Sequence, residues 1–222
     1  MTLLSIHRDS IAAAVRTLRS AVPPQGRFIL GLAGAPGAGK STLAEALCEA
    51  LGAEAALVPM DGFHLANAEL ARLGRAGRKG APDTFDAAGY AALLSRLRSP
   101  EVLASGQTVY APAFHREIEE PIAGEIPVTS SARILITEGN YLLLDDPAWR
   151  GVAGLLDQVW YVEAEDDALR QERLLARHIE FGRNPDQAKA WITGTDDPNA
   201  RRIEATRKKA HKVFRWGTGF VR

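Results

Sequence analysis

The stretch Gly34-Ala35-Pro36-Gly37-Ala38-Gly39-Lys40-Ser41, with Thr42 after it, sets the architecture of this 222-residue chain. It matches the pattern G-x-x-x-x-G-K-[ST], whose glycines let successive backbone N–H groups converge on phosphate oxygens. An apolar run at 28–33 precedes it, and an Ala- and Leu-rich stretch at 40–51 follows and ends at Gly52. A buried strand, this turn and a helix together predict a phosphate-binding loop.

The residue types of this loop predict a site for ATP and Mg2+. A helix that begins near Lys40 contributes its positive end, which is equivalent to about half a charge. We expect Lys40 to reach the β- and γ-phosphates and Ser41 to hold Mg2+. The predicted nucleotide contacts are Gly34, Ala35, Pro36, Gly37, Ala38, Gly39, Lys40, Ser41 and Thr42.

Apolar runs alternate with helical patterns along the rest of the chain. The expected strands are 28–33, 55–60, 132–137, 157–162 and 212–215, and the expected helices are 3–19, 40–51, 87–98, 166–181 and 200–211. This alternation predicts an α/β fold of the P-loop NTPase kind, in which three layers (α/β/α) surround a mostly parallel five-stranded sheet. We predict one domain over residues 1–222. A basic loop at 72–86 and a small hairpin or excursion at 107–131 interrupt the alternation as inserts.

Two acids come at the ends of expected strands, where ligands bind in a doubly wound sheet. Asp61 follows the second strand and Glu138 follows the third. Asp61 is a candidate for orienting a substrate hydroxyl and taking its proton, help that contributes about 10²–10⁴-fold to the rate. Glu138 would hold Mg2+ through water or orient the substrate. Structural roles stay open: a cap or turn carboxylate for Asp61, an acceptor for loop amides for Glu138, and an ordinary loop histidine for His64.

The composition favours a small-molecule enzyme of the cytoplasm. Lys+Arg and Asp+Glu number 27 each, so the chain has no bulk attraction for nucleic acid or an anionic membrane. Cys48 is the single cysteine, which excludes an internal disulfide. No apolar run approaches the roughly 20 residues that span a bilayer, and the N-terminus lacks a secretory pattern. The expected partner is a small-molecule substrate, and the oligomeric state stays open, a homodimer included.

Several blocks of the sequence carry a resemblance to a known family. They are the loop 34–42, Met60-Asp61-Gly62-Phe63-His64-Leu65, the run 78–86 (Arg-Lys-Gly-Ala-Pro-Asp-Thr-Phe-Asp), the run 110–116 (Tyr-Ala-Pro-Ala-Phe-His-Arg) and Glu138-Gly139. From about residue 26 to 215 the chain resembles the phosphoribulokinase/uridine kinase family of P-loop kinases, which includes bacterial pantothenate kinase. Within it, the chain looks most like bacterial proteins described as kinases of fructose transport systems.

The resemblance implies roles for individual residues. Asp61 falls on the family's catalytic base, and substrate contacts fall on His64, Arg78, Lys79, Tyr110, His115, Arg116 and Glu138. Residues 166–185 resemble the family's arginine-rich lid over ATP, where Arg173 and Arg177 share a helix face and would neutralise charge on the transferring phosphoryl group. Asn199, in a D-x-x-N-x-R pattern, would contact nucleotide or substrate, or cap a helix.

These observations predict a kinase that moves the γ-phosphate of ATP to an alcohol of a small metabolite. The resemblance favours a sugar such as fructose, with pantothenate or a nucleoside as alternatives; the tyrosine-rich stretch typical of nucleoside binding is not obvious. A GTPase would need an N-K-x-D motif, which is absent. A P-loop ATPase without an acceptor usually has paired acids after the third strand, whereas Gly139 follows Glu138 here. A sensor of a phosphorylated metabolite would not need Lys40 and Asp61 together.

Overall fold

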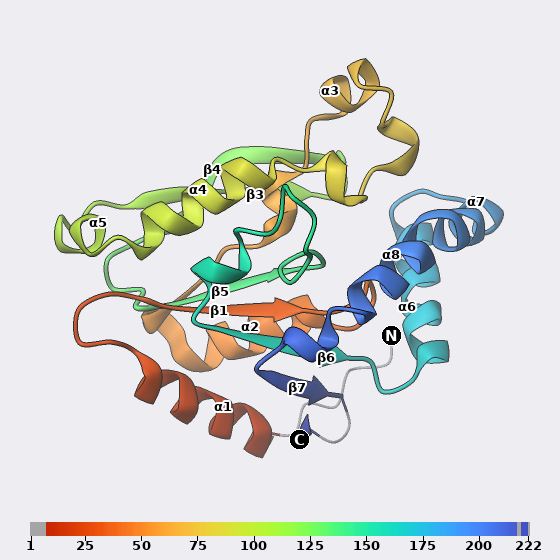
Figure 1. Ribbon diagram of the computed structural model, residues 1–222. Coiled ribbons are helices and arrows are strands. Elements are labelled where there is room, and N and C mark those ends of the chain that lie inside the picture. Colours follow the sequence, from red (N-terminus) through yellow and green to blue (C-terminus); the bar gives the residue numbers. More distant parts are fainter. Residues whose placement is uncertain (1–7, 217–218, 222) are drawn as a thin grey trace.

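The computed structural model describes residues 8–216 and 219–221, and a six-stranded sheet lies at its centre (Figure 1). In sheet order the strands are β2 (Ala55–Leu57), β5 (Ile134–Gly139), β1 (Phe28–Ala33), β6 (Gln158–Glu163), β7 (Lys212–Arg215) and β8 (Gly219–Val221). The first five are parallel, and β8 pairs with β7 in the antiparallel sense. The predicted α/β fold with a five-stranded parallel sheet is thus confirmed, and β8 is an addition to it.

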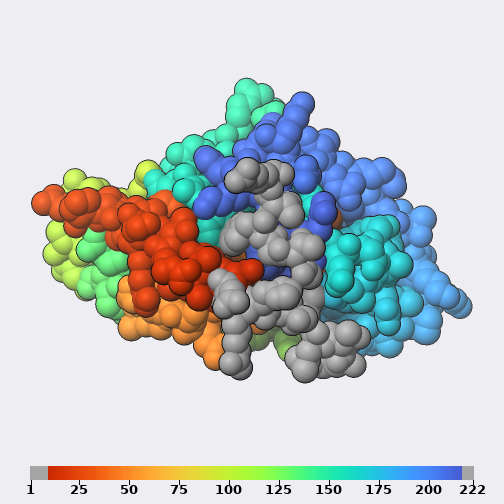
Figure 2. Space-filling model, turned by 90° about the horizontal axis from the view of Figure 1, so that it is seen from below, coloured from red at the N-terminus to blue at the C-terminus, as the bar shows by residue number. Residues whose placement is uncertain are grey.

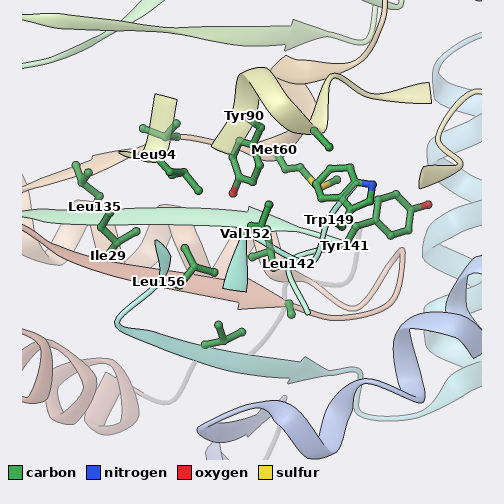
Figure 3. Packing of buried hydrophobic residues seen from close by; sticks show 14 of the residues in the cluster. Ile29, Met60, Tyr90, Leu94, Leu135, Tyr141, Leu142, Trp149, Val152 and Leu156 are labelled. Carbon is green, nitrogen blue, oxygen red and sulfur yellow. The ribbon is translucent and has the colours of Figure 1, made fainter. Parts of the chain in front are cut away.

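Alternating side chains of the strands build a core on each face of the sheet. Phe28, Leu30 and Leu32 of β1 face α1 (Arg8–Ala21) and α2 (Lys40–Leu51). Ile29 and its neighbours pack on the opposite face against α4 (Ala87–Arg98), as Figure 3 shows for Leu94. Seen from below, α1 forms an outer layer of the molecule (Figure 2). The remaining helices between β2 and β5 are α3 (Asn67–Arg72) and α5 (Pro100–Ala104).

Some boundaries differ from the sequence prediction. β2 ends before Pro59, which has no N–H to continue a ladder, and a 3-10 turn over Met60–Phe63 follows. β5 extends to Gly139, so Glu138 lies inside the strand, opposite Leu32, and not after it. The expected helix 200–211 has the wrong bounds: α8 covers Asp197–Glu204, and a separate 3-10 turn covers Arg207–Lys209. Asp86 caps the N-terminus of α4, where its side chain accepts from the Gly89 N–H, and the predicted end of α2 at Gly52 is confirmed.

The basic loop 72–86 is held to the core by two aromatic side chains. Trp149 packs against both Tyr90 and Tyr141 above the sheet (Figure 3). The indole N–H of Trp149 donates to the carbonyl of Pro82 at 3.0 Å, and the Tyr141 hydroxyl donates to the carbonyl of Gly80. Because both donors are anchored in the core, the loop keeps a fixed path toward the carboxyl ends of the strands.

Two further segments frame that edge of the sheet. The insert 107–131 forms an antiparallel hairpin of β3 (Val109–His115) and β4 (Glu120–Val128). After β6, α6 (Asp167–Glu180), α7 (Pro185–Trp191), a π-helical turn (Ile192–Asp196) and α8 lie beyond the strand ends (Figure 1). Among the residues that the structure describes, no helix has the length and apolar character to cross a bilayer.

Candidate functional site

The glycine-rich loop between β1 and α2 is held in a conformation that only glycine accepts at two positions. Gly37 and Gly39 have φ values of 79° and 89°, in the left-handed region. A Cβ atom would lie 2.9 Å from Leu174 Cγ at Gly37 and 2.6 Å from Trp216 Nε1 at Gly39. The Trp216 N–H also donates to the carbonyl of Ala38 at 2.7 Å. The loop is therefore packed tightly between α6 and the end of β7.

The backbone of this loop presents donors that the protein itself does not use. Within residues 8–216, the N–H groups of Gly37, Gly39, Lys40 and Ser41 make no hydrogen bond. They surround the N-terminus of α2, where the helix dipole favours negative charge. A cradle of free N–H groups at a helix start is the geometry that binds phosphate.

Lys40 is buried at the start of α2 and is surrounded by oxygen atoms. Its Nζ donates to the carbonyls of Gly34 at 2.9 Å and Ala35 at 3.1 Å, and to Oδ1 of Asn140 at 2.8 Å. Burial lowers the pKa of Lys40, and the nearby Glu138 carboxylate opposes this shift. No role was predicted for Asn140 from the sequence. A polar side chain just beyond the carboxyl end of β5 is the signal that could have identified it.

The two predicted acids reach the same cleft. A guanidinium nitrogen of Arg116 lies 3.1 Å from Oδ2 of Asp61, and Ser41 donates to Oε1 of Glu138 at 3.0 Å. Asp61 lies in the turn that follows β2, Glu138 lies in β5, and these two strands pair directly. Parallel pairing thus brings the carboxylates together beside the loop.

The two carboxylates have opposite pKa shifts. Burial alone would raise the pKa of Asp61, but nearby cations (His64 when protonated, Arg116 and Lys40) lower it below its ordinary value. Burial also lowers the pKa of His64, so at neutral pH Arg116 and Lys40 carry this effect. Burial and the negative charge of Asp61 raise the pKa of Glu138. Of the two, Asp61 is the acid that holds its charge.

Nine of the predicted site residues line one cleft between the loop, the hairpin and the lid helices. They are Pro36, Lys40, Ser41, Asp61, His64, Lys79, Arg116, Glu138 and Arg177. Lys79 donates to Oδ1 of Asn67 at 2.6 Å and to the carbonyl of Glu119, and its ammonium lies 5.1 Å from the centre of the Phe114 ring. The Arg177 guanidinium faces the cleft, and it makes no hydrogen bond or ion pair within the described part of the chain.

Four predicted residues outside the glycine-rich loop do not line this cleft. Arg78 pairs with Asp83 at 2.6 Å, and His115 pairs with Glu125 at 2.6 Å across the hairpin. The four are Arg78, Tyr110, His115 and Arg173. Because successive side chains of a strand point to opposite faces, Phe114 reaches the cleft while His115 does not. Tyr110 is 59% exposed on the hairpin, so nothing in its position supports a substrate contact.

Beside Arg183 of the predicted lid, the cleft is lined by His178, Trp191 and Asp196, for which no role was predicted from the sequence. Asp196 lies 2.7 Å from Nε2 of His178, and a guanidinium nitrogen of Arg183 lies 2.7 Å from Nδ1 of the same ring. A guanidinium only donates, so Nδ1 accepts and Nε2–H donates to Asp196. Arg183 also stacks over Trp191 at 4.2 Å. Asn199 lines the cleft from inside α8, so the predicted alternative of a helix cap is wrong.

Comparison with known proteins gives relatives that share this architecture. The family model described as "Phosphoribulokinase / Uridine kinase family" matches residues 29–218. The "ATP-dependent kinase-like protein notR'" of Aspergillus versicolor is 37% identical over 154 residues, which cover 67% of this chain and 88% of that protein. A pantothenate kinase of Mycolicibacterium vanbaalenii is 33% identical over 62% of this chain and 44% of its own length.

Two solved structures are also similar to this chain. A protein of Silicibacter sp. TM1040, whose crystal structure is titled "putative fructose transport system kinase", is 40% identical and has a TM-score of 0.77 over 93% of this chain and 98% of its own. A D-glycerate 3-kinase of Cryptococcus neoformans shares the fold at 15% identity, with a TM-score of 0.67 over 93% of this chain and 92% of its own. The match over residues 29–218 means that this chain belongs to the phosphoribulokinase/uridine kinase family of small-molecule kinases.

Proposed function

We propose that this protein is an ATP-dependent phosphotransferase that moves the γ-phosphate to an alcohol group of a small metabolite. The observation that carries the proposal is the meeting of the free loop N–H groups, Lys40 and an ionised Asp61 in one cleft. The loop N–H groups and Lys40 suit the phosphates of a nucleotide, and Asp61 suits an incoming hydroxyl. The whole chain would act as a single domain.

The nucleotide would lie with its phosphates in the loop 34–42. Lys40 already has oxygen ligands in Gly34, Ala35 and Asn140, so it can exchange carbonyl oxygens for phosphate oxygens without leaving its pocket. Ser41 and Glu138 fit a magnesium ion, since their oxygen atoms lie 3.0 Å apart at the mouth of the loop and oxygen is the ligand that Mg2+ prefers. When bound, the ion offsets negative charge on the phosphates.

Asp61 would orient the acceptor hydroxyl and take its proton while the new oxygen–phosphorus bond forms. The bond between the γ-phosphorus and the β–γ bridging oxygen breaks in the same step, and ADP leaves. Arg116 helps to lower the pKa of Asp61, and Arg177 offers an unpaired guanidinium to the charge that spreads over the phosphoryl oxygens. Lid closure would exclude water as a competing acceptor.

For the acceptor we propose a sugar such as fructose. The name of the Silicibacter relative, which is 40% identical, supports this choice. The name of the pantothenate kinase relative keeps pantothenate as the alternative, and a uridine-like nucleoside is a further candidate of the same family. We place the enzyme in the cytoplasm, with small molecules as its partners.

Release of ADP in the presence and absence of acceptors tests the proposal. Purified protein with MgATP is supplied in turn with fructose, pantothenate and uridine. We expect ADP release to rise several-fold with one of these acceptors. Phosphoryl transfer requires a bound hydroxyl whose proton Asp61 can accept, so ADP forms slowly without it. Equal ADP release with and without every acceptor would contradict a kinase and favour a P-loop ATPase. The variant Asp61→Asn serves as the control for acceptor-dependent turnover.

A further inference from the structure

A chain of contacting side chains runs from Asp196 to Trp191 in the segment after β6. Asp196, at the end of the π-helical turn, lies 2.7 Å from Nε2 of His178 in α6. Nδ1 of the same ring lies 2.7 Å from a guanidinium nitrogen of Arg183, and the Arg183 guanidinium lies 4.2 Å from the centre of the Trp191 ring. These contacts join α6, α7 and the π-helical turn beyond the strand ends (Figure 1).

The backbone of Arg183 is fixed on both sides. The turn after α6 carries Gly182, whose φ is 92°, and the Arg183 N–H donates to the carbonyl of His178 at 3.0 Å, as in a Schellman motif. Immediately after Arg183, Asn184 begins α7 with a capping box. Because the backbone is held in this way, the contacts of the Arg183 side chain decide where its guanidinium lies.

Asp196 fixes the orientation and the tautomer of the His178 ring. Both residues are buried, so the Asp196 carboxylate needs a donor, and the Nε2–H of His178 supplies it. Nδ1 of the neutral ring then carries a lone pair, which is what the Arg183 donor requires. A proton on Nδ1 would place two donors face to face. The bond to Asp196 therefore prepares the ring to accept from Arg183.

Arg183 keeps donors for a ligand. A guanidinium has five N–H groups, and the bond to His178 is the only hydrogen bond that the Arg183 side chain makes within residues 8–216 and 219–221. Arg183 lines the same cleft as Lys40 and Asp61. Unused guanidinium N–H groups in this cleft suit the negatively charged oxygen atoms of the reactants.

We propose that His178 is a positioning residue: its ring, held by Asp196, orients the Arg183 guanidinium toward the reactants in the cleft. The inference rests on the proposed function and adds how the lid arginine is held before any reactant binds. A side chain that is already ordered loses little conformational freedom when it contacts a reactant. A misplacement of about 1 Å can lower the rate by about a hundredfold.

Three variants separate the two hydrogen bonds of the His178 ring. His178→Phe keeps a ring and loses both bonds. The amide oxygen of His178→Asn can take the place of Nδ1 and accept from Arg183, whereas the longer His178→Gln can reach Asp196 with its amide N–H. With the acceptor that raises ADP release, we expect His178→Phe and His178→Gln to lower kcat/KM by about tenfold to hundredfold. His178→Asn should retain most of the wild-type value.

The stability of the same variants should follow the other bond. Loss of the donor to Asp196 leaves a buried carboxylate unpaired. His178→Phe and His178→Asn should therefore lower the urea midpoint, whereas His178→Gln should stay near wild type. A kcat/KM that followed the urea midpoints would show that His178 only anchors the π-helical turn, and it would overturn the proposal.

A double-mutant cycle with Arg183→Met tests whether His178 acts through Arg183. We expect His178→Phe to lower kcat/KM in the wild type and to have no further effect in Arg183→Met, because the group that it positions is already gone. Additive losses from the two substitutions would mean that they act independently, which is the result that contradicts a positioning role.

A measurement without turnover tests the tautomer. Nitrogen-15 NMR of the labelled wild type, with the ring assigned through His178→Asn, should show a proton on Nε2 of His178 and none on Nδ1. In Arg183→Met the Nδ1 resonance should shift while Nε2 keeps its proton. A proton on Nδ1 in the wild type, or an Nδ1 resonance that Arg183→Met leaves unchanged, would overturn the proposal. The proposed function fails separately, when none of fructose, pantothenate and uridine raises ADP release.

Discussion

The guanidinium of Arg116 contacts the carboxylate of Asp61, with 3.1 Å between the two atoms, and so joins the turn of the β3–β4 hairpin to the turn after β2. The contact brings together residues that are 55 positions apart. It also places a permanent cation beside the proposed base. The hairpin thereby influences the charge of the group that receives the proton.

Replacing Arg116 should move the pH dependence of catalysis. Arg116 helps to hold the pKa of Asp61 below its ordinary value, so Arg116→Met raises that pKa. Only the ionised carboxylate can take a proton, and the acid limb of kcat/KM therefore moves to higher pH. The Arg116 side chain is 36% exposed, so water screens its charge and the shift should be below about one pH unit. A profile of kcat/KM against pH for both proteins measures it.

Arg116→Lys is the matched control for this shift. It retains a positive charge near Asp61 while it loses the planar guanidinium, so its acid limb should stay near that of wild type. A profile that moves equally in both variants would mean that geometry, and not charge, sets the pKa.

Asp61→Asn should remove catalysis and leave nucleotide binding intact. The amide fills nearly the same volume but cannot take a proton, and loss of general-base help lowers kcat by about 10²–10⁴-fold. Asp61 makes no hydrogen bond to the loop within the described residues, so the Kd for ATP should change little. ADP release measures kcat, and a nucleotide titration measures the Kd for ATP. An ATP affinity that fell in parallel with kcat would place Asp61 in the nucleotide site.

The phosphate loop and the sheet could be predicted because local rules determine them. The pattern at 34–42 requires specific backbone geometry, and alternation of strands and helices implies parallel pairing. Pairing of β2 with β5 then brings Asp61 and Glu138 to one edge without further information. The least accurate parts were element boundaries, where Pro59 and the π-helical turn at Ile192–Asp196 set limits that periodicity does not reveal.

The contacts that complete the candidate site could not be predicted in the same way. Lys40 and Asn140 are 100 positions apart, and His178 and Asp196 are 18 apart. Such pairs depend on how the lid and the loops after the strands lie against the sheet, which no local pattern specifies. The run 110–116, which contains Tyr110 and His115, could be identified from the sequence as a block that resembles the family. Which of its side chains faces the cleft depends on the path of β3.

Gly39→Ala should destabilise the loop more than backbone strain alone explains. Gly39 and Gly106 both have positive φ, 89° and 68°. A Cβ atom at Gly39 would lie 2.6 Å from Trp216 Nε1, whereas at Gly106 it would have no atom of the described residues within 4 Å. Gly106→Ala should therefore cost only about 1–2 kcal/mol of unfolding free energy, and Gly39→Ala should cost more and also weaken ATP binding. Urea unfolding and a nucleotide titration measure the two effects; equal losses of stability would contradict the clash with Trp216.

Tyr141→Phe should loosen the basic loop, because the hydroxyl of Tyr141 donates to the carbonyl of Gly80, which borders the cleft. The change keeps the ring and removes one hydrogen bond, so we expect a loss of about 1–2 kcal/mol in unfolding free energy and a higher KM for the acceptor. Tyr161→Phe is the matched control, since the buried Tyr161 hydroxyl has no partner among the described residues. Removing that unpaired group should leave stability unchanged or raise it. Urea midpoints at constant m compare the two variants, and a larger loss at Tyr161 than at Tyr141 would contradict the anchoring of the loop through Gly80.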